Sequence, residues 1–101
     1  MTLTVENVPE DQAYVAYAGD QVAGRAEYQV AKALVVFTHT EVDPRFEGQG
    51  VGGTLVREAL DDVRARGLSV LPLCPFVKAW IGRHPDYQDL VYRAAPSTVT
   101  D

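Results

Sequence analysis

Four glycines fall within six consecutive positions, residues 48 to 53, in the segment EVDPRFEGQGVGGTLV. Glycine loses more backbone freedom on ordering than any other residue, so such a cluster marks a place where the backbone approaches another group closely. A helical apolar period begins directly after it, and a helix N-terminus offers unpaired N–H groups and about half a positive charge. The spacing therefore predicts an anion site, with phosphate as the expected occupant. The alternative is that the glycines only allow the helix to pack closely on a sheet.

The residues around this loop constrain the type of phosphate ligand. Gly48, Gly50 and Gly53 satisfy the G-x-G-x-x-G fingerprint of dinucleotide-binding domains. That fingerprint also needs an acidic residue at the end of the next strand to bind a ribose, and the next apolar segment, LSVLPLC, has none. A Walker phosphate loop is excluded because the chain has no Gly-Lys-Ser or Gly-Lys-Thr. A Rossmann-like nucleotide binder, which would bind NAD, stays open as a rival class.

Cys74 is the one cysteine of the chain, and it directly precedes a proline. If Pro75 is the first residue of a helix, Cys74 is its N-cap, where the helix dipole stabilises a thiolate. A cysteine in this position could act as a base, a group carrier or a proton donor. The alternative is a small buried apolar side chain, which is the usual role of a lone cysteine.

His39 and Glu41 are two residues apart near the end of the strand predicted before the glycine loop. Their spacing places both side chains on one face of that strand, and either could serve as a general base. A cross-strand hydrogen bond or a solvated strand face would explain them equally well.

The elements that must position these residues follow from the apolar periods of the chain. Period-two patterns predict antiparallel strands in the first part, and a helical stripe begins at about Gly50 and stops at Gly67. The predicted strands cover residues 3–5, 13–19, 22–30, 34–42 and 68–74, and a second helix runs from Pro75 to before Pro85. These elements predict an α/β mixed sheet, with antiparallel N-terminal strands followed by a β-α-β-α unit whose two strands are parallel.

Composition narrows the class of protein. The 101 residues carry 9 basic and 14 acidic side chains, a formal charge of −5, which argues against nucleic acid as a partner. One cysteine and two histidines offer no spacing typical of a metal site. No apolar run is long enough to span a membrane, so we expect a cytoplasmic protein. We expect a single domain over residues 1 to 95 and a flexible tail over residues 96 to 101.

The segment VDPRFEGQGVGGTLVREAL resembles the acetyl-CoA signature of the GNAT superfamily of N-acyltransferases. Its motif, Q/R-x-x-G-x-G/A at a helix start, falls on residues 47 to 52. The later segment LPLCPFVKAWIGRHPDYQDLVY is similar to the C-terminal half of a small, truncated, single-domain branch of that superfamily, which carries a cysteine after the next strand. Together the two matches cover about residues 34 to 92.

This resemblance implies a GNAT-like fold and an enzyme that transfers an acetyl group from acetyl-CoA to an amine. It implies that the loop and the end of the strand before it bind coenzyme A, through Val42, Arg45, Gly48, Gln49, Gly50, Val51, Gly52 and Gly53. It also places Cys74 near the acetyl group, with His39 and Glu41 as candidate bases, and it involves no metal.

The chain departs from the family pattern in two places. Glu47 stands where a basic or amide residue usually begins the motif, so Arg45 is the expected source of the missing positive charge. The first two predicted strands leave little room for the helices that normally cover the acceptor side, so that side is open or is completed by a homodimer or a partner protein. The acceptor stays open between a small amine, a peptide N-terminus and a lysine side chain. A coenzyme A-binding module without transferase activity is the alternative function.

Overall fold

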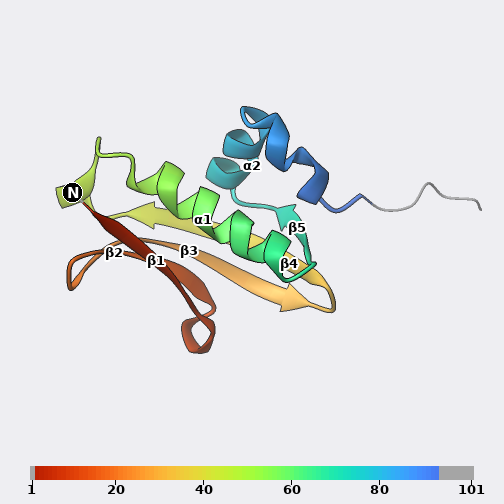
Figure 1. Cartoon of the computed structure of the whole chain (residues 1–101), viewed down its shortest axis with the longest axis horizontal. Helices are drawn as coiled ribbons and strands as arrows, with labels where there is room; N and C mark the ends of the chain where they lie inside the picture. The colour runs from red at the N-terminus through yellow and green to blue at the C-terminus, as the bar shows by residue number, and fades with distance from the viewer. Residues whose placement is uncertain (1, 94–101) are drawn as a thin grey trace, which may run out of the picture.

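The computed structural model describes residues 2–93, which form one mixed sheet with its α-helices on a single face (Figure 1). The strands are β1 (Leu3–Val8), β2 (Ala13–Ala18), β3 (Gln21–Ala31), β4 (Leu34–Val42) and β5 (Ser69–Pro72). Their order in the sheet follows the chain, with antiparallel pairing from β1 to β4 and parallel pairing between β4 and β5. The predicted mixed sheet, an antiparallel meander followed by a β-α-β-α unit, is confirmed. The expected tail, residues 96 to 101, lies outside the described residues.

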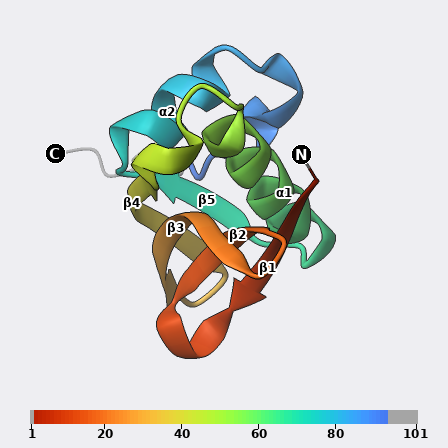
Figure 2. The same cartoon turned by 90° about the vertical axis from the view of Figure 1, so that its left-hand side faces the viewer.

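Two α-helices, α1 (Val51–Ala65) and α2 (Pro75–Gly82), cover the sheet, and three short 3₁₀ turns connect elements: η1 (Pro9–Asp11), η2 (Pro44–Phe46) and η3 (Pro85–Leu90). Helix α1 contacts all five strands, and α2 lies beside it at the β5 edge (Figure 2). The predicted apolar stripe of α1 is buried; its members are Val51, Leu55, Val56, Ala59, Leu60 and Val63. Gly67 ends α1 with a left-handed φ of 71°, as its position predicts.

The period-two pattern of residues 22–30 puts Val22 and Val30 on one face of β3 with Ala26 and Tyr28, which are buried. In the structure Val22 and Val30 are instead 46% and 54% exposed, and at Val22 the reason is a bulge. A register shift pairs Ala16 with Gly24 and Tyr17 with Val22, so Ala23 bulges out of the ladder. A bulge inserts one extra residue and reverses the faces beyond it, which buries Ala23 and exposes Val22.

A second bulge, in β4, decides which side chains reach the helices. Glu27 pairs with His39 and Tyr28 pairs with Phe37, which leaves Thr38 without a partner in β3. Before the bulge, Phe37 faces the buried core; after it, Val42 packs against that core and the side chain of Thr40 contacts Cys74. His39 and Glu41 therefore project from the opposite face of the sheet, which no helix covers in the described part of the chain. We call it the open face.

No helix within residues 2–93 is both long and apolar enough to cross a membrane.

Gly24 lets β3 and β4 approach the start of α1, and this contact generates a stability test. A Cβ at Gly24 would lie 2.9 Å from the Glu41 carbonyl oxygen and 3.2 Å from Cγ1 of Val51. The backbone cannot yield cheaply, so we expect Gly24→Ala to lower the free energy of unfolding by about 1–3 kcal/mol. Gly82→Ala is the control, because a Cβ there meets nothing within 4 Å.

Urea denaturation of the two variants measures both free energies of unfolding. Gly82→Ala should leave the value unchanged or raise it by about 0.4–1 kcal/mol, since alanine reduces the freedom of the unfolded chain. Equal effects of the two substitutions would contradict the close approach at Gly24.

Candidate functional site

The glycine loop between β4 and α1 depends on glycine for its backbone conformation. Gly48 and Gly50 have φ values of 78° and 77°, in the left-handed region that other residues rarely adopt. A Cβ at either position would meet nothing within 4 Å, so conformation rather than space selects glycine there. Gly52 differs, because a Cβ on it would lie 2.7 Å from Cζ of Phe76. Its missing side chain allows α1 and α2 to meet at the loop.

The segment that leads into the loop is fixed by one ion pair. The carboxylate of Asp43 caps η2 by accepting the backbone N–H of Arg45, and it binds the guanidinium of Arg45 through Nε at 3.0 Å and Nη2 at 3.1 Å. The side-chain hydrogen bonds from Arg45, followed by the backbone one, hold the pKa of Asp43 below its usual value. The chain therefore enters the glycine loop in a fixed direction.

Helix α1 begins with N–H groups that have no partner within the helix. Gly50 is the N-cap, and the carbonyl of Gly50 accepts the N–H of Thr54 at 3.1 Å. The N–H groups of Val51, Gly52 and Gly53 precede the first helical hydrogen bond, and no side chain caps the helix. These donors and the helix dipole are the features that make a helix N-terminus suitable for an anion, and the anion site itself stays a prediction.

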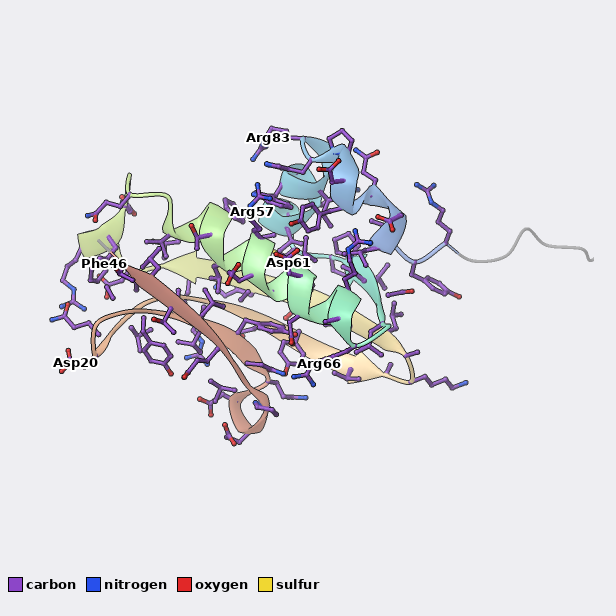
Figure 3. All side chains as sticks on the ribbon, viewed as in Figure 1. Asp20, Phe46, Arg57, Asp61, Arg66 and Arg83 are labelled. Carbon is purple, nitrogen blue, oxygen red and sulfur yellow. The ribbon has the colours of Figure 1, made fainter. Side chains whose placement is uncertain are left out.

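A hollow of about 280 Å³ lies against these N–H groups, and we call it the loop hollow. It is lined by Val42, Phe46, Glu47, Gly48, Gly50, Val51, Gly52, Gly53 and Phe76. Figure 3 labels Phe46 at the end of the molecule that carries the loop. The hollow therefore combines backbone donors on one wall with two aromatic rings and a valine on the others.

Six of the eight residues predicted to bind coenzyme A line the loop hollow: Val42, Gly48, Gly50, Val51, Gly52 and Gly53. Gln49 is exposed and lines no cavity described here. Arg45 lines a neighbouring cavity instead, with its guanidinium on Asp43. Glu47 is exposed at the hollow, so its carboxylate can extend into solvent.

Two aromatic residues of the hollow were missed by sequence reasoning. The helical period of residues 75–84 puts Phe76 on one face with Val77, Trp80 and Ile81, but Phe76 is 41% exposed and its ring covers Gly52. Phe46 belongs to the turn η2, which has no sequence pattern of its own. A signal for Phe76 exists in retrospect, since a glycine on a helix face is free to receive an aromatic ring from a facing helix.

The edge of β4 that faces β5 is unpaired over its last residues. Pairing of β4 with β5 ends at Phe37 and Pro72, and the carbonyl of Phe37 accepts the N–H groups of both Leu73 and Cys74, at 3.0 and 2.9 Å. Beyond this point β4 continues to Val42 with β3 alone. We call this free edge of β4, together with the start of α2 that faces it, the slot.

The register shows which backbone groups face this slot. The N–H of Asp43 donates to the carbonyl of Ala23 at 2.8 Å, so this pair is a hydrogen-bonded one. Hydrogen-bonded and non-hydrogen-bonded pairs alternate in antiparallel sheets, so Thr40 and Val42 direct their N–H and C=O groups away from β3. The slot thus has a strand edge that can pair with an extended ligand.

Cys74 lies across the slot from this edge. It is the N-cap of α2 with Pro75 at the first helical position, as the sequence predicts. Its side chain is 3% exposed, and its Sγ lies 3.4 Å from Oγ1 of Thr40. Val42 lies two residues after Thr40, and Phe76 lies two residues after Cys74. Both line the loop hollow, so the contact of Thr40 with Cys74 is close to that hollow.

His39 and Glu41 lie on the open face, away from Cys74. Their side chains are 58% and 59% exposed, and Nε2 of His39 lies 3.9 Å from Oε2 of Glu41. The structure brings these two candidate bases together, as their shared face predicts, but no hydrogen bond or ion pair joins either one to Cys74. Any joint action would have to pass around the free edge of β4.

A cavity of about 420 Å³ lies on the other side of Val42, between the start of β3 and the end of β4, and we call it the hairpin cavity. It is lined by Gln21, Val22, Gly24, Arg25, Glu41, Val42, Asp43, Pro44 and Arg45.

A third cavity, of about 620 Å³, lies between β1 and α1, and three of its polar residues are joined by hydrogen bonds. Asp62 accepts hydrogen bonds from the hydroxyl of Tyr14 at 2.6 Å and from Arg66 at 2.8 Å. Burial, and then the bond to Asp62, raise the pKa of Tyr14 well above its usual value. These hydrogen bonds give Tyr14, Asp62 and Arg66 a structural role in this cavity. Within residues 2–93, no three His, Cys, Asp or Glu residues group together as metal ligands.

Comparison with known proteins gives one family and several similar structures. The model of the family described as GCN5-related N-acetyl-transferase matches residues 13–90. None of the curated proteins compared with the chain matches it.

Among solved structures, a GCN5-like protein from Staphylococcus aureus is 21% identical, with a TM-score of 0.69 over 92% of this chain and 91% of that one. The ribosomal-protein-S18-alanine N-acetyltransferase of Escherichia coli is 23% identical, with a TM-score of 0.56, over 59% of this chain but only 39% of that one. The IAA acetyltransferase of Bacillus cereus is 18% identical, with a TM-score of 0.56, over 70% of this chain and 65% of that one. At these identities the likeness shows the fold, and it confirms the predicted GNAT-like architecture.

The contact between Gly52 and Phe76 yields a binding test. We expect Gly52→Ala to displace the Phe76 ring, which lines the hollow, and to weaken binding of coenzyme A at least tenfold. Gly53→Ala is the matched control, because its Cβ would lie 3.6 Å from Nε1 of Trp80, an ordinary contact. Calorimetric titration measures both affinities, and equal affinity of the two variants would show that the ring is not part of the binding site.

The ion pair of Asp43 and Arg45 yields a pH test. A carboxyl whose pKa is lowered by folding stabilises the fold above its unfolded pKa, and this contribution is lost as the pH falls through the folded value. We expect Arg45→Met to raise the pKa of Asp43 toward its ordinary value, measured by NMR titration of the carboxyl carbon. The difference in stability between wild type and variant should shrink as the medium is acidified. An unchanged pKa in the variant would remove Arg45 as the cause.

Proposed function

Because the chain belongs to the GCN5-related N-acetyltransferase family, we propose that it is an acetyl-CoA-dependent enzyme that transfers the acetyl group to a primary amine. One observation carries this proposal. The free edge of β4 runs from Thr40, whose side chain contacts Cys74, to Val42, which lines the loop hollow beside the unpaired N–H groups of α1. We place the activity in a single domain over residues 1 to 95.

The groups along this edge and at the loop hollow match the parts of acetyl-CoA. The N–H groups of Val51, Gly52 and Gly53 suit the pyrophosphate, which is the anion expected at a helix N-terminus. The free backbone groups of Thr40 and Val42 suit the amide groups of the pantetheine arm, which pair as a strand would. The thioester then lies near Cys74, at the closed end of the slot where β4 and β5 meet.

Binding of the pyrophosphate would rest on the backbone more than on charged side chains. No basic residue lines the loop hollow, and Glu47 brings a negative charge to its rim. Arg45 uses Nε and Nη2 for Asp43, which leaves Nη1 free to donate to a phosphate without breaking that pair. We therefore retain Arg45 as a cofactor-binding residue that acts from the rim.

The transfer step sets the roles of the candidate catalytic residues. The nitrogen of an uncharged amine attacks the thioester carbonyl carbon, the C–S bond breaks with its electron pair on sulfur, and the amine loses one proton while the thiolate gains one. We assign Cys74 to the thioester side, as the donor of that proton or as a transient acetyl carrier. We assign His39 and Glu41, on the open face, to accept the proton of the amine.

A second function, coenzyme A binding without transfer, has its own support. Cys74 is almost fully buried and makes no contact with either candidate base. A binding module would need neither exposure of the thiol nor a link to a base.

Calorimetric titration with acetyl-CoA, coenzyme A and NAD tests the site without knowledge of the acceptor. We expect both coenzyme A species to bind and NAD not to bind. No binding of either coenzyme A species would overturn the acetyltransferase and the module together, whereas binding of NAD alone would favour a nucleotide-binding domain.

Substitution of Cys74 then separates the enzyme from the module. We expect Cys74→Ala to bind acetyl-CoA as wild type does. It should transfer the acetyl group to an amine, with release of coenzyme A, about 10²–10⁴-fold more slowly, which is the usual effect of losing a proton-transfer group. Cys74→Ser, which keeps a proton donor of similar size, is the matched control and should retain more activity. Full turnover by Cys74→Ala would remove the thiol from the mechanism, and absence of turnover in wild type with every amine would favour the module.

A further inference from the structure

The hairpin cavity lies directly behind the proposed acetyl-CoA site. Val42 lines both the cavity and the loop hollow, and Glu41 follows Thr40, whose side chain contacts Cys74. Beyond Phe37 no strand pairs with the outer edge of β4 within the described residues, so nothing in the sheet separates the two faces there. A molecule in the cavity can therefore approach a thioester in the slot by passing around that edge.

Two opposite charges line this cavity without binding each other. Arg25 and Glu41 are direct cross-strand partners, and both project from the open face. Their nearest ionic partners lie along their own strands: Nε of Arg25 is 3.7 Å from Glu27, and Glu41 is 3.9 Å from His39. Both distances exceed the 2.7–2.9 Å typical of charge-assisted hydrogen bonds.

Arg25 also has unused hydrogen-bonding capacity. Its Nε is buried and has no hydrogen-bond partner, and no other side-chain nitrogen or oxygen in the described part of the chain is both buried and unpaired. Buried donors in native proteins are nearly always satisfied, so this one calls for an explanation. The other arginine of the cavity, Arg45, differs, since Asp43 already binds it through two nitrogens.

These observations identify a chemical class of acceptor. A guanidinium and a carboxylate on directly opposed residues, with a cavity of about 420 Å³ before them, match a small molecule that carries an amine and an anion a few bonds apart. A simple cationic amine would leave the buried Nε of Arg25 without a hydrogen-bond acceptor and would place a second positive charge beside the guanidinium.

We propose that the hairpin cavity is the acceptor site of the acetyltransferase and that it takes a zwitterionic amine of amino-acid size, with Glu41 binding the amine and Arg25 binding the anionic group. This inference rests on the proposed function, because the cavity is an acceptor site only if acetyl-CoA occupies the slot. The anionic group is a carboxylate or a phosphonate, which the guanidinium would bind in the same way.

The test compares matched pairs of acceptors. Each α-amino acid is compared as an acceptor with the amine that lacks its carboxyl group. It is also compared with the aminophosphonate that carries the same side chain. Release of coenzyme A gives kcat/KM for each compound. We expect the anionic member of each pair to exceed the plain amine at least tenfold, and the carboxylate and phosphonate arms show which anion is preferred.

Substitution of Arg25 shows whether this residue causes the preference. Arg25→Gln should lower kcat/KM for the zwitterions at least tenfold and leave the plain amines unchanged, so that the preference disappears. Arg25→Lys, which keeps the charge but loses the planar group, should retain part of it. Arg83→Gln is the matched control, because Arg83 lies on the exposed end of α2, at the opposite side of the molecule from Asp20 and the start of β3 (Figure 3). Thermal unfolding establishes that each variant is folded.

A binding measurement separates failure of this inference from failure of the proposed function. NMR titration of the protein with an amino acid, in the presence of coenzyme A, should shift the amide signals of Gly24, Glu41 and Val42, and Arg25→Gln should abolish the shifts. Shifts of this kind without any transfer would support the cavity while overturning the enzyme. Acetylation of plain amines as efficiently as amino acids, or amide signals that do not respond, would overturn the cavity assignment and leave the acetyltransferase intact.

Discussion

The functional half of this protein depends on the point at which two parallel strands stop pairing. The carbonyl of Phe37 accepts two successive N–H groups, from Leu73 and Cys74, and this closes the ladder between β4 and β5. After it, β4 continues for five residues while the chain turns at Pro75 into α2. Since β3 holds β4 on its other side, β4 stays a strand while its outer edge is unpaired within residues 2–93. The slot and the placement of Cys74 at a helix start both follow from this unequal length.

The bulge at Thr38 determines which side chains of β4 lie on each face of the sheet. Without the extra residue, the alternation that buries Phe37 would turn His39 and Glu41 toward the helices and would expose Thr40. With it, Thr40 and Val42 face Cys74 and the loop hollow, and the charged pair faces the open side. One strand thus presents a hydroxyl group and an apolar side chain on one face and a charged pair on the other. A single change of register supplies both surfaces.

Charge is distributed around the site in an uncommon way for a phosphate binder. The chain is acidic overall, with a formal charge of −5, and the loop hollow has Glu47 rather than a basic residue at its rim. Its positive potential comes from the N–H groups and the dipole of α1, which no side chain caps. The basic groups nearby, Arg25 and Arg45, lie instead on the hairpin cavity. Backbone donors therefore line the loop hollow, whereas the basic side chains line the hairpin cavity beside it.

The sequence by itself determined the elements whose signals are local. The period-two and helical patterns, the stop at Gly67 and the cap formed by Cys74 and Pro75 all predict structure within a few residues, and the glycine spacing located the start of α1. The tertiary structure alone decided which residues meet across the chain. The bulges at Ala23 and Thr38 depend on the register between strands, so the burial of Val22 was mispredicted. The contact of Thr40 with Cys74, the ring of Phe76 over Gly52 and the shared cavity of Arg25 and Glu41 join residues far apart in sequence, because packing and register, rather than local propensity, fix these distances.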